Sequence, residues 1–354
     1  MLIRTYREGD EDKIFELHKV VYPEREYDKE SWIEWWRWMY RENPLGKARI
    51  WLAEHDGRIV GQYPLTFMSI KFENEILKVC QNIDLMTHPD YRGQGIFSRL
   101  ERRALDEVSS KGVYITIGFP NRAAYPGHIK SGWFDIAPMR VMVKPLNWNN
   151  TLRMKVSNTF LAKLCGIGAS LVDRIFYRSQ KPPVVEGLSV TQVPSFDDRI
   201  NEFWTKASSQ YKIMVVRDRD YLNWRYCAVP GVDYSIYIAT KARQICGYLV
   251  LRCMGWKQIK LGIIFDMLAQ SQEIAQSLVF KGIEHCKREN TDLIYHRTIA
   301  NKTYIKAFRE NGFISIPLIK GGRFCAYSRD PHISKEFLRD AENWLVQPGD
   351  SDMI

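Results

Sequence analysis

The spacing of apolar positions along the first half of the chain predicts a β-sheet interrupted by amphipathic helices. Asp10 and Asp28 stand where they can cap two of these helices. The turns Asp56-Gly57 and Glu73-Asn74 separate three strands. The predicted elements are a strand at 2–6, the two capped helices, strands at 50–53, 59–72 and 76–86, a helix from about residue 94, a strand at 113–119, a helix at 121–132 and a closing strand at 133–143.

A strand, a glycine loop and a helix start follow one another in residues 84–101. Pro89 ends the strand because it cannot donate to a ladder. Gly93 and Gly95 allow a sharp turn close to a ligand, and Arg92 adds a cation. The first N–H groups of a helix have no partner within it, so this arrangement predicts a phosphate site. A dinucleotide-binding loop is excluded because Ser98 replaces its third glycine, and a Gly-Lys-Ser/Thr triphosphate loop is absent.

The loop Arg92-Gly93-Gln94-Gly95-Ile96-Phe97 resembles the Gln/Arg-x-x-Gly-x-Gly/Ala loop of the GNAT superfamily of acyl-CoA-dependent N-acyltransferases, although Phe97 replaces a small residue. Residues 121–133 resemble the family's Asn…Tyr…Gly-Phe signature. The order of the predicted elements over residues 1–145 is also that of the GNAT fold. The resemblance implies acetyl-CoA or another acyl-CoA as co-substrate, held by Leu85, Met86, Thr87, Arg92, Gly93, Gln94, Gly95, Ile96, Phe97, Ser98 and Asn121.

The second half of the chain repeats the first in a weaker form. Four matches keep their order, and their offset drifts only from 188 to 180 residues, which indicates two copies of one domain. The matched segments are Trp36-Arg37-Trp38 with Trp224-Arg225-Tyr226, Ile59-Val60-Gly61 with Ile245-Cys246-Gly247, Ile83-Asp84-Leu85-Met86 with Phe265-Asp266-Met267-Leu268, and Asn121 plus Gly132-Trp133 with Asn301 plus Gly312-Phe313.

The expected fold is therefore α/β, with two tandem GNAT-type domains that each have a central mixed sheet flanked by helices. The boundaries are predicted at 1–148 for the domain with the phosphate loop, 149–185 for a basic amphipathic linker, 186–330 for a degenerate copy and 331–354 for a C-terminal helix and tail. In the copy, residues 269–273 replace the loop without glycine or arginine, and Glu273 would repel phosphate. One cofactor site per chain is expected.

Candidate catalytic groups follow from the chemistry of acyl transfer to an amine, which needs a base for the amine and an acid for the thiolate. Asp84 precedes the loop and is the first candidate base, although Asp266 in the copy favours a structural role; Glu34 and His88 are weaker candidates. By resemblance, the family's tyrosine acid falls on His128, with Tyr125 three residues earlier. Tyr125 is favoured because His128 follows a Pro-Gly break of the kind that faces solvent.

Composition narrows the class of partner. The 354 residues carry a net charge of +10, and half of it lies at 151–183, where six basic residues accompany Asp173. That segment suggests peripheral membrane contact through 151–181, but an interdomain helix is favoured. Seven scattered cysteines without Cys-x-x-Cys predict no metal site and a reducing, cytoplasmic location.

The predicted function is an acyl-CoA-dependent N-acyltransferase, most simply an N-acetyltransferase, that acts on a small-molecule primary amine such as an amino sugar or an amino acid derivative. One alternative is a tRNA-dependent aminoacyl transferase with paired GNAT-like halves, which suits the basic charge but does not need the phosphate loop. Nucleic acid is therefore the less favoured partner. The other alternative is a non-catalytic acyl-CoA-binding module. The sequence leaves the oligomeric state open.

Overall fold

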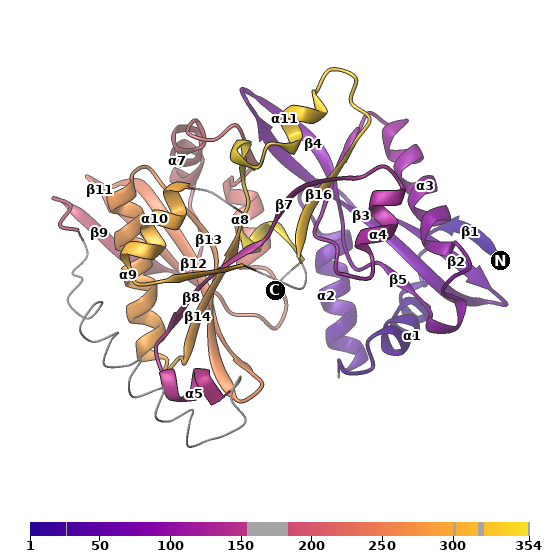
Figure 1. Ribbon diagram of the computed structural model, residues 1–354, viewed down its shortest axis with the longest axis horizontal. Helices are drawn as coiled ribbons and strands as arrows, with labels where there is room; N and C mark the ends of the chain where they lie inside the picture. Colours follow the sequence, from indigo (N-terminus) through magenta and orange to yellow (C-terminus); the bar gives the residue numbers. More distant parts are fainter. Residues whose placement is uncertain (26, 154–182, 300–301, 318–321, 353–354) are drawn as a thin grey trace.

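The computed structural model describes residues 1–25, 27–153, 183–299, 302–317 and 322–352. Two β-sheets, each with helices packed against it, lie side by side (Figure 1). The predicted tandem α/β architecture is confirmed. The linker helix expected within 151–183 and the matched residue Asn301 fall outside the described residues, apart from the short helix α5 (Trp148–Arg153).

The first half follows the predicted order of elements. Its elements are β1 (Leu2–Thr5), α1 (Glu11–Val21), α2 (Lys29–Arg41), β2 (Arg49–His55), β3 (Arg58–Phe72), β4 (Glu75–Asn82), β5 (Met86–Thr87), the 3-10 turn η1 (Pro89–Tyr91), α3 (Ile96–Ser109), β6 (Ile115–Gly118), α4 (Tyr125–Lys130), β7 (Phe134–Pro138) and β8 (Arg140–Pro145). The helix predicted from residue 94 begins two residues later, at Ile96.

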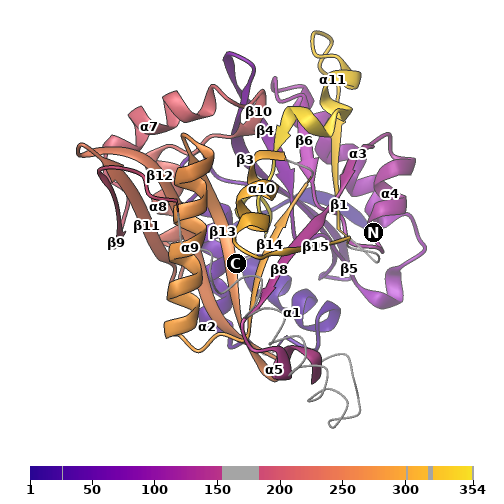
Figure 2. The ribbon, with the colours of Figure 1, turned by 60° about the vertical axis from the view of Figure 1, so that its left-hand side comes forward.

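The second half repeats this order, with β10 between its first two helices and a C-terminal segment added after β16. Its elements are β9 (Leu188–Val193), α7 (Arg199–Ser208), β10 (Ile213–Val215), α8 (Arg219–Tyr226), β11 (Ser235–Lys241), β12 (Gln244–Trp256), β13 (Ile259–Ala269), α9 (Gln272–Arg288), β14 (Leu293–Thr298), α10 (Lys302–Glu310), β15 (Ile314–Pro317), β16 (Arg323–Ser328), α11 (Lys335–Arg339), η2 (Ala341–Asn343), β17 (Trp344–Leu345) and η3 (Pro348–Asp350). Figure 2 shows α9 and α10 over one face of the second sheet.

Both sheets are mixed, with one parallel pair at the same place in each. The first has the order β1-β2-β3-β4-β6-β16-β7, with β5 and β10 also paired to β3 and β17 to β10. The second has the order β15-β8-β14-β13-β12-β11-β9. The matched parallel pairs are β4 with β6 and β13 with β14, each joined by a helical crossover, and β10 with β17 is a further parallel pair in the first sheet. Each half thus places a helix start, α3 or α9, after the strand that precedes this crossover.

The two halves exchange one strand each. β16 of the second half lies between β6 and β7 of the first sheet, and β8 of the first half lies between β14 and β15 of the second. The single closing strand expected at 133–143 was therefore wrong: it breaks at Met139, and its two parts join different sheets. The domain boundaries at 148, 186 and 330 remain a prediction. Each sheet nevertheless contains one strand from the other predicted domain, β16 in the first sheet and β8 in the second.

A pair of tryptophans joins the halves at their interface. Trp38 and Trp224 stack with ring centroids 5.0 Å apart, and each indole N–H donates to the other's backbone carbonyl, at 2.9 and 3.3 Å. These reciprocal bonds show that Trp38 is the counterpart of Trp224, so the match of Trp36 with Trp224 was wrong by two residues. Of the tryptophans of α2, Trp32, Trp36 and Trp38 are buried. The core and the interface between the halves together bury these three tryptophans.

Candidate functional site

The glycine loop has the backbone that the sequence predicted. Gly93 and Gly95 have φ of +77° and +70°, which L side chains rarely adopt, and a Cβ added at either would meet nothing within 4 Å. Gly95 also stands at the N-cap of α3, where no side chain caps the helix. The first N–H groups of α3 are therefore left for a ligand beside open space. Arg92 is exposed, and its Nε donates to the Thr87 carbonyl at 3.3 Å.

The strands beside this loop separate at the point where it begins. β4 and β6 pair in parallel only as far as Asn82 and Gly118. The chain then bulges at Asp84, which has φ of +49°, and resumes as β5, whose ladder partner is β3. The other edge of β5 faces the opening between β4 and β6. Among the described residues, the N–H groups expected to hold the thioester, those of Leu85–Thr87, lie on this segment.

The loop's neighbours explain its departure from the family pattern. The Phe97 ring packs on α4: a Cβ at Gly127 would lie 2.8 Å from it, and the His128 ring centroid is 5.1 Å away. Phe97 therefore fills the space between α3 and α4 and does not obstruct the loop. Asn121 closes the turn that leads into α4, because its side-chain oxygen accepts hydrogen bonds from the N–H groups of Ala123 and Ala124, both at 3.0 Å.

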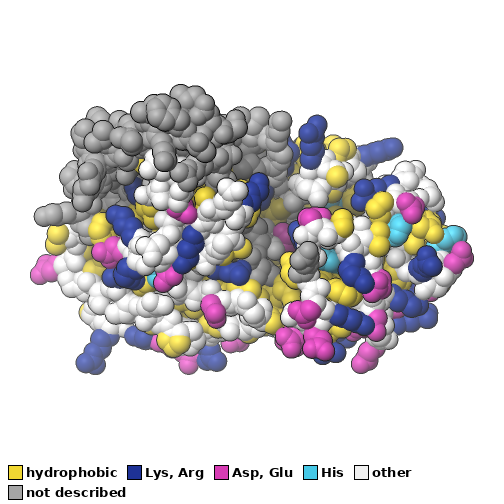
Figure 3. Space-filling view, turned by 90° about the horizontal axis from the view of Figure 1, so that it is seen from below, with side chains coloured by type: hydrophobic (Ala, Val, Ile, Leu, Met, Phe, Trp, Pro, Cys, Tyr) yellow, Lys and Arg dark blue, Asp and Glu magenta, His cyan; other side chains and the backbone are white. Residues whose placement is uncertain are grey.

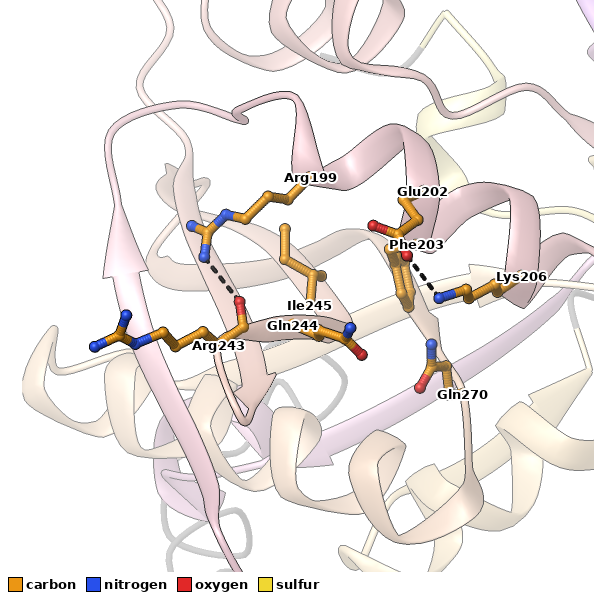
Figure 4. Close-up of a pocket in the computed structure, with 8 residues that line it drawn as sticks. All are labelled: Arg199, Glu202, Phe203, Lys206, Arg243, Gln244, Ile245 and Gln270. Carbon is orange, nitrogen blue, oxygen red and sulfur yellow. Dashed lines mark hydrogen bonds and ion pairs between the residues drawn. The ribbon is translucent and has the colours of Figure 1, made fainter.

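The corresponding helix start in the second half is closed. Ser271 stands at the N-cap of α9 in an extended conformation, and its hydroxyl accepts from the Ile274 N–H at 3.4 Å. Glu273 adds a negative charge in the first turn. Beside it, a small pocket holds the ion pair of Lys206 with Glu202 at 2.7 Å, with Gln270 at its edge (Figure 4). The predicted loss of the phosphate loop thus corresponds to a helix whose N-terminus its own side chain caps.

His128 is fully buried, so its expected solvent-facing position was wrong. Its Nδ1 lies 2.5 Å from Glu101 Oε1, and its Nε2 lies 3.0 Å from Asn82 Nδ2. Because the amide nitrogen can only donate, Nε2 accepts and Nδ1–H donates to the carboxylate. Sequence reasoning missed Glu101 and Asn82. The signal for Glu101 was its place among the apolar positions of α3, where an acidic side chain needs a buried partner.

Tyr125 begins α4 and is half-buried. Burial, followed by the nearby Asp135 carboxylate, raises the pKa of its phenol. The Arg323 guanidinium lies over its ring, 5.4 Å from the centroid, and forms an ion pair with Asp135. Arg323 belongs to the exchanged strand β16, so the second half of the chain supplies a residue that contacts Tyr125. The raised pKa keeps the Tyr125 hydroxyl protonated, whereas both ring nitrogens of His128 are already engaged.

Asp84 lies at the bulge between β4 and β5. Its Oδ2 accepts from Tyr40 Oη and Gln62 Nε2, both at 3.3 Å. Burial raises its pKa to about 6, and the Asp352 carboxylate adds to this rise. Of the weaker base candidates, Glu34 is exposed on α2, and His88 uses Nδ1 to accept from the Asp90 N–H at 3.3 Å. The structure thus brings Asp84 next to Leu85–Thr87 and leaves Glu34 outside.

Three further features of the described residues concern metal binding, membrane spanning and surface charge. No group of three or more His, Cys, Asp or Glu side chains suited to a metal occurs among the described residues. In the same part of the chain, no helix is long and apolar enough to cross a membrane. On the face shown in Figure 3, the described Lys and Arg side chains are interspersed with acidic and apolar ones. That view shows no continuous basic surface over the described residues.

Comparisons with known proteins place this geometry in a family. The family model described as an acetyltransferase (GNAT) domain matches residues 2–134. A GCN5-related N-acetyltransferase from Anabaena variabilis superposes with a TM-score of 0.65 at 12% identity, over 92% of this chain and 72% of that one. Saccharomyces cerevisiae N-myristoyltransferase with bound myristoyl-CoA superposes at 0.60 and 10% identity, over 92% and 83% of the chains. No curated protein matches the sequence.

Residues 2–134 therefore resemble a GNAT acetyltransferase domain, and the whole chain shares the two-sheet fold of these solved structures. At these identities the solved structures show a shared fold and do not transfer a substrate.

Proposed function

We propose that the chain is an acyl-CoA-dependent N-acyltransferase, most simply an N-acetyltransferase, with a small-molecule primary amine as acceptor. The observation that carries the proposal is the uncapped start of α3 behind two left-handed glycines, beside the opening between β4 and β6. Open space beside both glycine α-carbons fits a pyrophosphate held by backbone N–H groups. The second half has none of these features at α9, so one site per chain is proposed.

The roles of the chain's own residues follow from this placement. Gly93–Ser98 and Arg92 would hold the pyrophosphate, and the open edge of β5 would donate to the thioester carbonyl as charge develops on its oxygen. Bound acyl-CoA supplies the activated acyl group. Asp84 would take a proton from the acceptor's ammonium group, because its raised pKa brings it close to the range of a useful base. Tyr125 would hand a proton to the departing thiolate. Acetyl transfer and these two roles belong to the proposal.

A thiol-release assay with acetyl-CoA over a panel of primary amines tests the proposal. Amine-dependent release is expected in the native chain and should be lost in Gly95→Glu, which strains the left-handed position and places a carboxylate where phosphate binds. Ser271→Glu, the matched change at the start of α9, should leave it intact. Acetyl-CoA binding without release for any amine would instead support the non-catalytic acyl-CoA-binding module. Transfer of an aminoacyl group from a charged tRNA to the amine, without thiol release, would support the aminoacyl transferase.

A further inference from the structure

The second half contains a buried cation held between two carboxylates. Arg217 Nε lies 3.0 and 3.1 Å from the two carboxylate oxygens of Asp266, and Arg217 Nη2 lies 2.7 Å from Asp350 Oδ1. Tyr226 and Tyr248 donate their hydroxyls to Asp266 at 2.9 and 3.0 Å. These groups are all buried. Asp266 is thus a carboxylate whose hydrogen-bonding positions the chain itself fills.

The C-terminal tail completes this arrangement. Gln347 donates its amide to Asp266 Oδ1 at 3.0 Å and to the Met267 carbonyl at 2.8 Å, and its oxygen accepts from the Met267 N–H. The tail then crosses towards the first half, where Gln81 of β4 donates to the Asp350 carbonyl at 2.7 Å. Gln347 of the tail therefore lies at Asp266, which is the second half's counterpart of Asp84. Asp350 of the tail contacts β4 of the first half.

The reciprocal pair Trp38 and Trp224 fixes which residues correspond. The same offset that relates those two tryptophans relates Tyr40 to Tyr226 and Gln62 to Tyr248. In both halves these side chains donate to the aspartate at the end of the third long strand: Tyr226 and Tyr248 to Asp266, and Tyr40 and Gln62 to Asp84. The two halves share a carboxylate with two matched donors.

They differ in what else binds the carboxylate. Among the described residues, no arginine or tail amide donates to Asp84, and its two side-chain hydrogen bonds are long, at 3.3 Å. Gln62 is 1% exposed, and its amide oxygen has no hydrogen-bond partner, although its amide nitrogen lies against Asp84. A buried acceptor without a donor is costly, so this oxygen favours a ligand with N–H groups.

We propose that Asp84 and Gln62 bind the ammonium group of the acceptor at the place where the second half holds its own Arg217, and that the carboxylate of Asp84 disfavours acceptors that carry a carboxylate of their own. The inference rests on the proposed function and names its substrate class, a cationic alkyl amine. The ammonium N–H bonds point to Asp84 Oδ and Gln62 Oε1. One N–H bond breaks, its proton passes to Asp84, and the electron pair stays on nitrogen, which then attacks the thioester carbonyl. The C–S bond breaks, the thiolate leaves with a proton from Tyr125, and the second proton lost by the nitrogen replaces the one that Tyr125 gave.

Two amines of matched length test the charge preference. In acetyl-CoA assays, 1,5-diaminopentane should have a kcat/KM at least about tenfold above that of 6-aminohexanoate, because the carboxylate of 6-aminohexanoate is repelled by Asp84, which no arginine of the described residues pairs. Equal kcat/KM values for the two amines in the native chain would overturn this charge preference.

Gln62→Leu tests the second contact. It should raise KM for 1,5-diaminopentane about ten- to hundredfold, as expected for a lost hydrogen bond to a charged group, with little change in kcat. Gln62→Glu keeps an acceptor of the same shape and should restore tight binding, measured by titration calorimetry with the amine alone. Tyr248→Phe is the control in the second half and should leave KM unchanged. Unchanged amine binding in Gln62→Leu would overturn the inference.

The two proposals fail in different ways. If acetyl-CoA does not bind the native chain, the proposed function fails. If acetyl-CoA binds and is consumed, but amines bind without regard to Gln62 and charge, only the cation site fails.

Discussion

The two halves begin the same helix in opposite ways. α3 starts behind a left-handed glycine with no side-chain cap, whereas α9 starts at Ser271, whose hydroxyl accepts from the helix. A cap stabilises a helix by satisfying one of its first N–H groups. The uncapped start forgoes that stabilisation and keeps its donors for a ligand. The same contrast recurs at the aspartates, because the chain fills the partners of Asp266 and leaves Asp84 with two long hydrogen bonds. The first half leaves the N–H groups of α3 and the carboxylate of Asp84 for a ligand, whereas the second half bonds the matching groups to its own side chains.

The aspartates give the largest expected difference. Asp84→Asn should lower kcat about 10²- to 10⁴-fold, the usual range for a lost general base, with the melting temperature at neutral pH unchanged or raised, because the buried charge is removed. Asp266→Asn should instead destabilise the fold by about 3–5 kcal/mol, because it leaves Arg217 as a buried charge with one partner fewer. Chemical denaturation and steady-state kinetics on both variants check this. Similar effects of the two changes on both quantities would remove the contrast between the halves.

The two candidates for the general acid, Tyr125 and His128, should also differ in whether their substitution lowers kcat or stability. Tyr125→Phe should lower kcat by about 10²-fold or more while the fold stays intact, since Tyr125 is half-buried. His128→Ala should mainly destabilise the protein, because it leaves buried Glu101 without its imidazole partner. Pre-steady-state turnover and thermal unfolding distinguish these results. A stable His128→Ala variant with a large loss of kcat would make His128 the acid, and normal turnover in both variants would show that solvent protonates the thiolate.

A smaller effect is expected in the pH dependence. Burial raises the pKa of Asp84 to about 6, so its carboxylate form is available above that pH and is lost as the pH falls through it. The acidic limb of kcat/KM should therefore lie near pH 6 and disappear in Asp84→Asn. The sign for stability is opposite to that of an ion-paired carboxylate: because the folded pKa is raised, Asp84 costs stability above pH 6, and this cost is relieved as it protonates. If the acidic limb of kcat/KM survives in Asp84→Asn, a group other than Asp84 causes it.

Sequence reasoning reached the features that are local. The glycine loop, the order of elements and the missing loop of the second half are patterns within a few tens of residues. The strand exchange was not accessible, because β7 and β8 are separated only by Met139 and both are apolar strands that fit either sheet. The bond between His128 and Glu101 joins residues from two helices. The hydrogen bond from Gln347 to Asp266 depends on how the two sheets pack, and no sequence pattern in residues 344–352 predicts it.

Titration calorimetry of CoA with the native chain and with Gly95→Glu tests the central claim that only the first half keeps a cofactor site. The account predicts one CoA per native chain, an affinity at least about a hundredfold weaker in Gly95→Glu because a strained carboxylate would face the pyrophosphate, and no change in Ser271→Glu. Two equivalent CoA sites per chain, or an affinity that Gly95→Glu leaves unchanged, would contradict it.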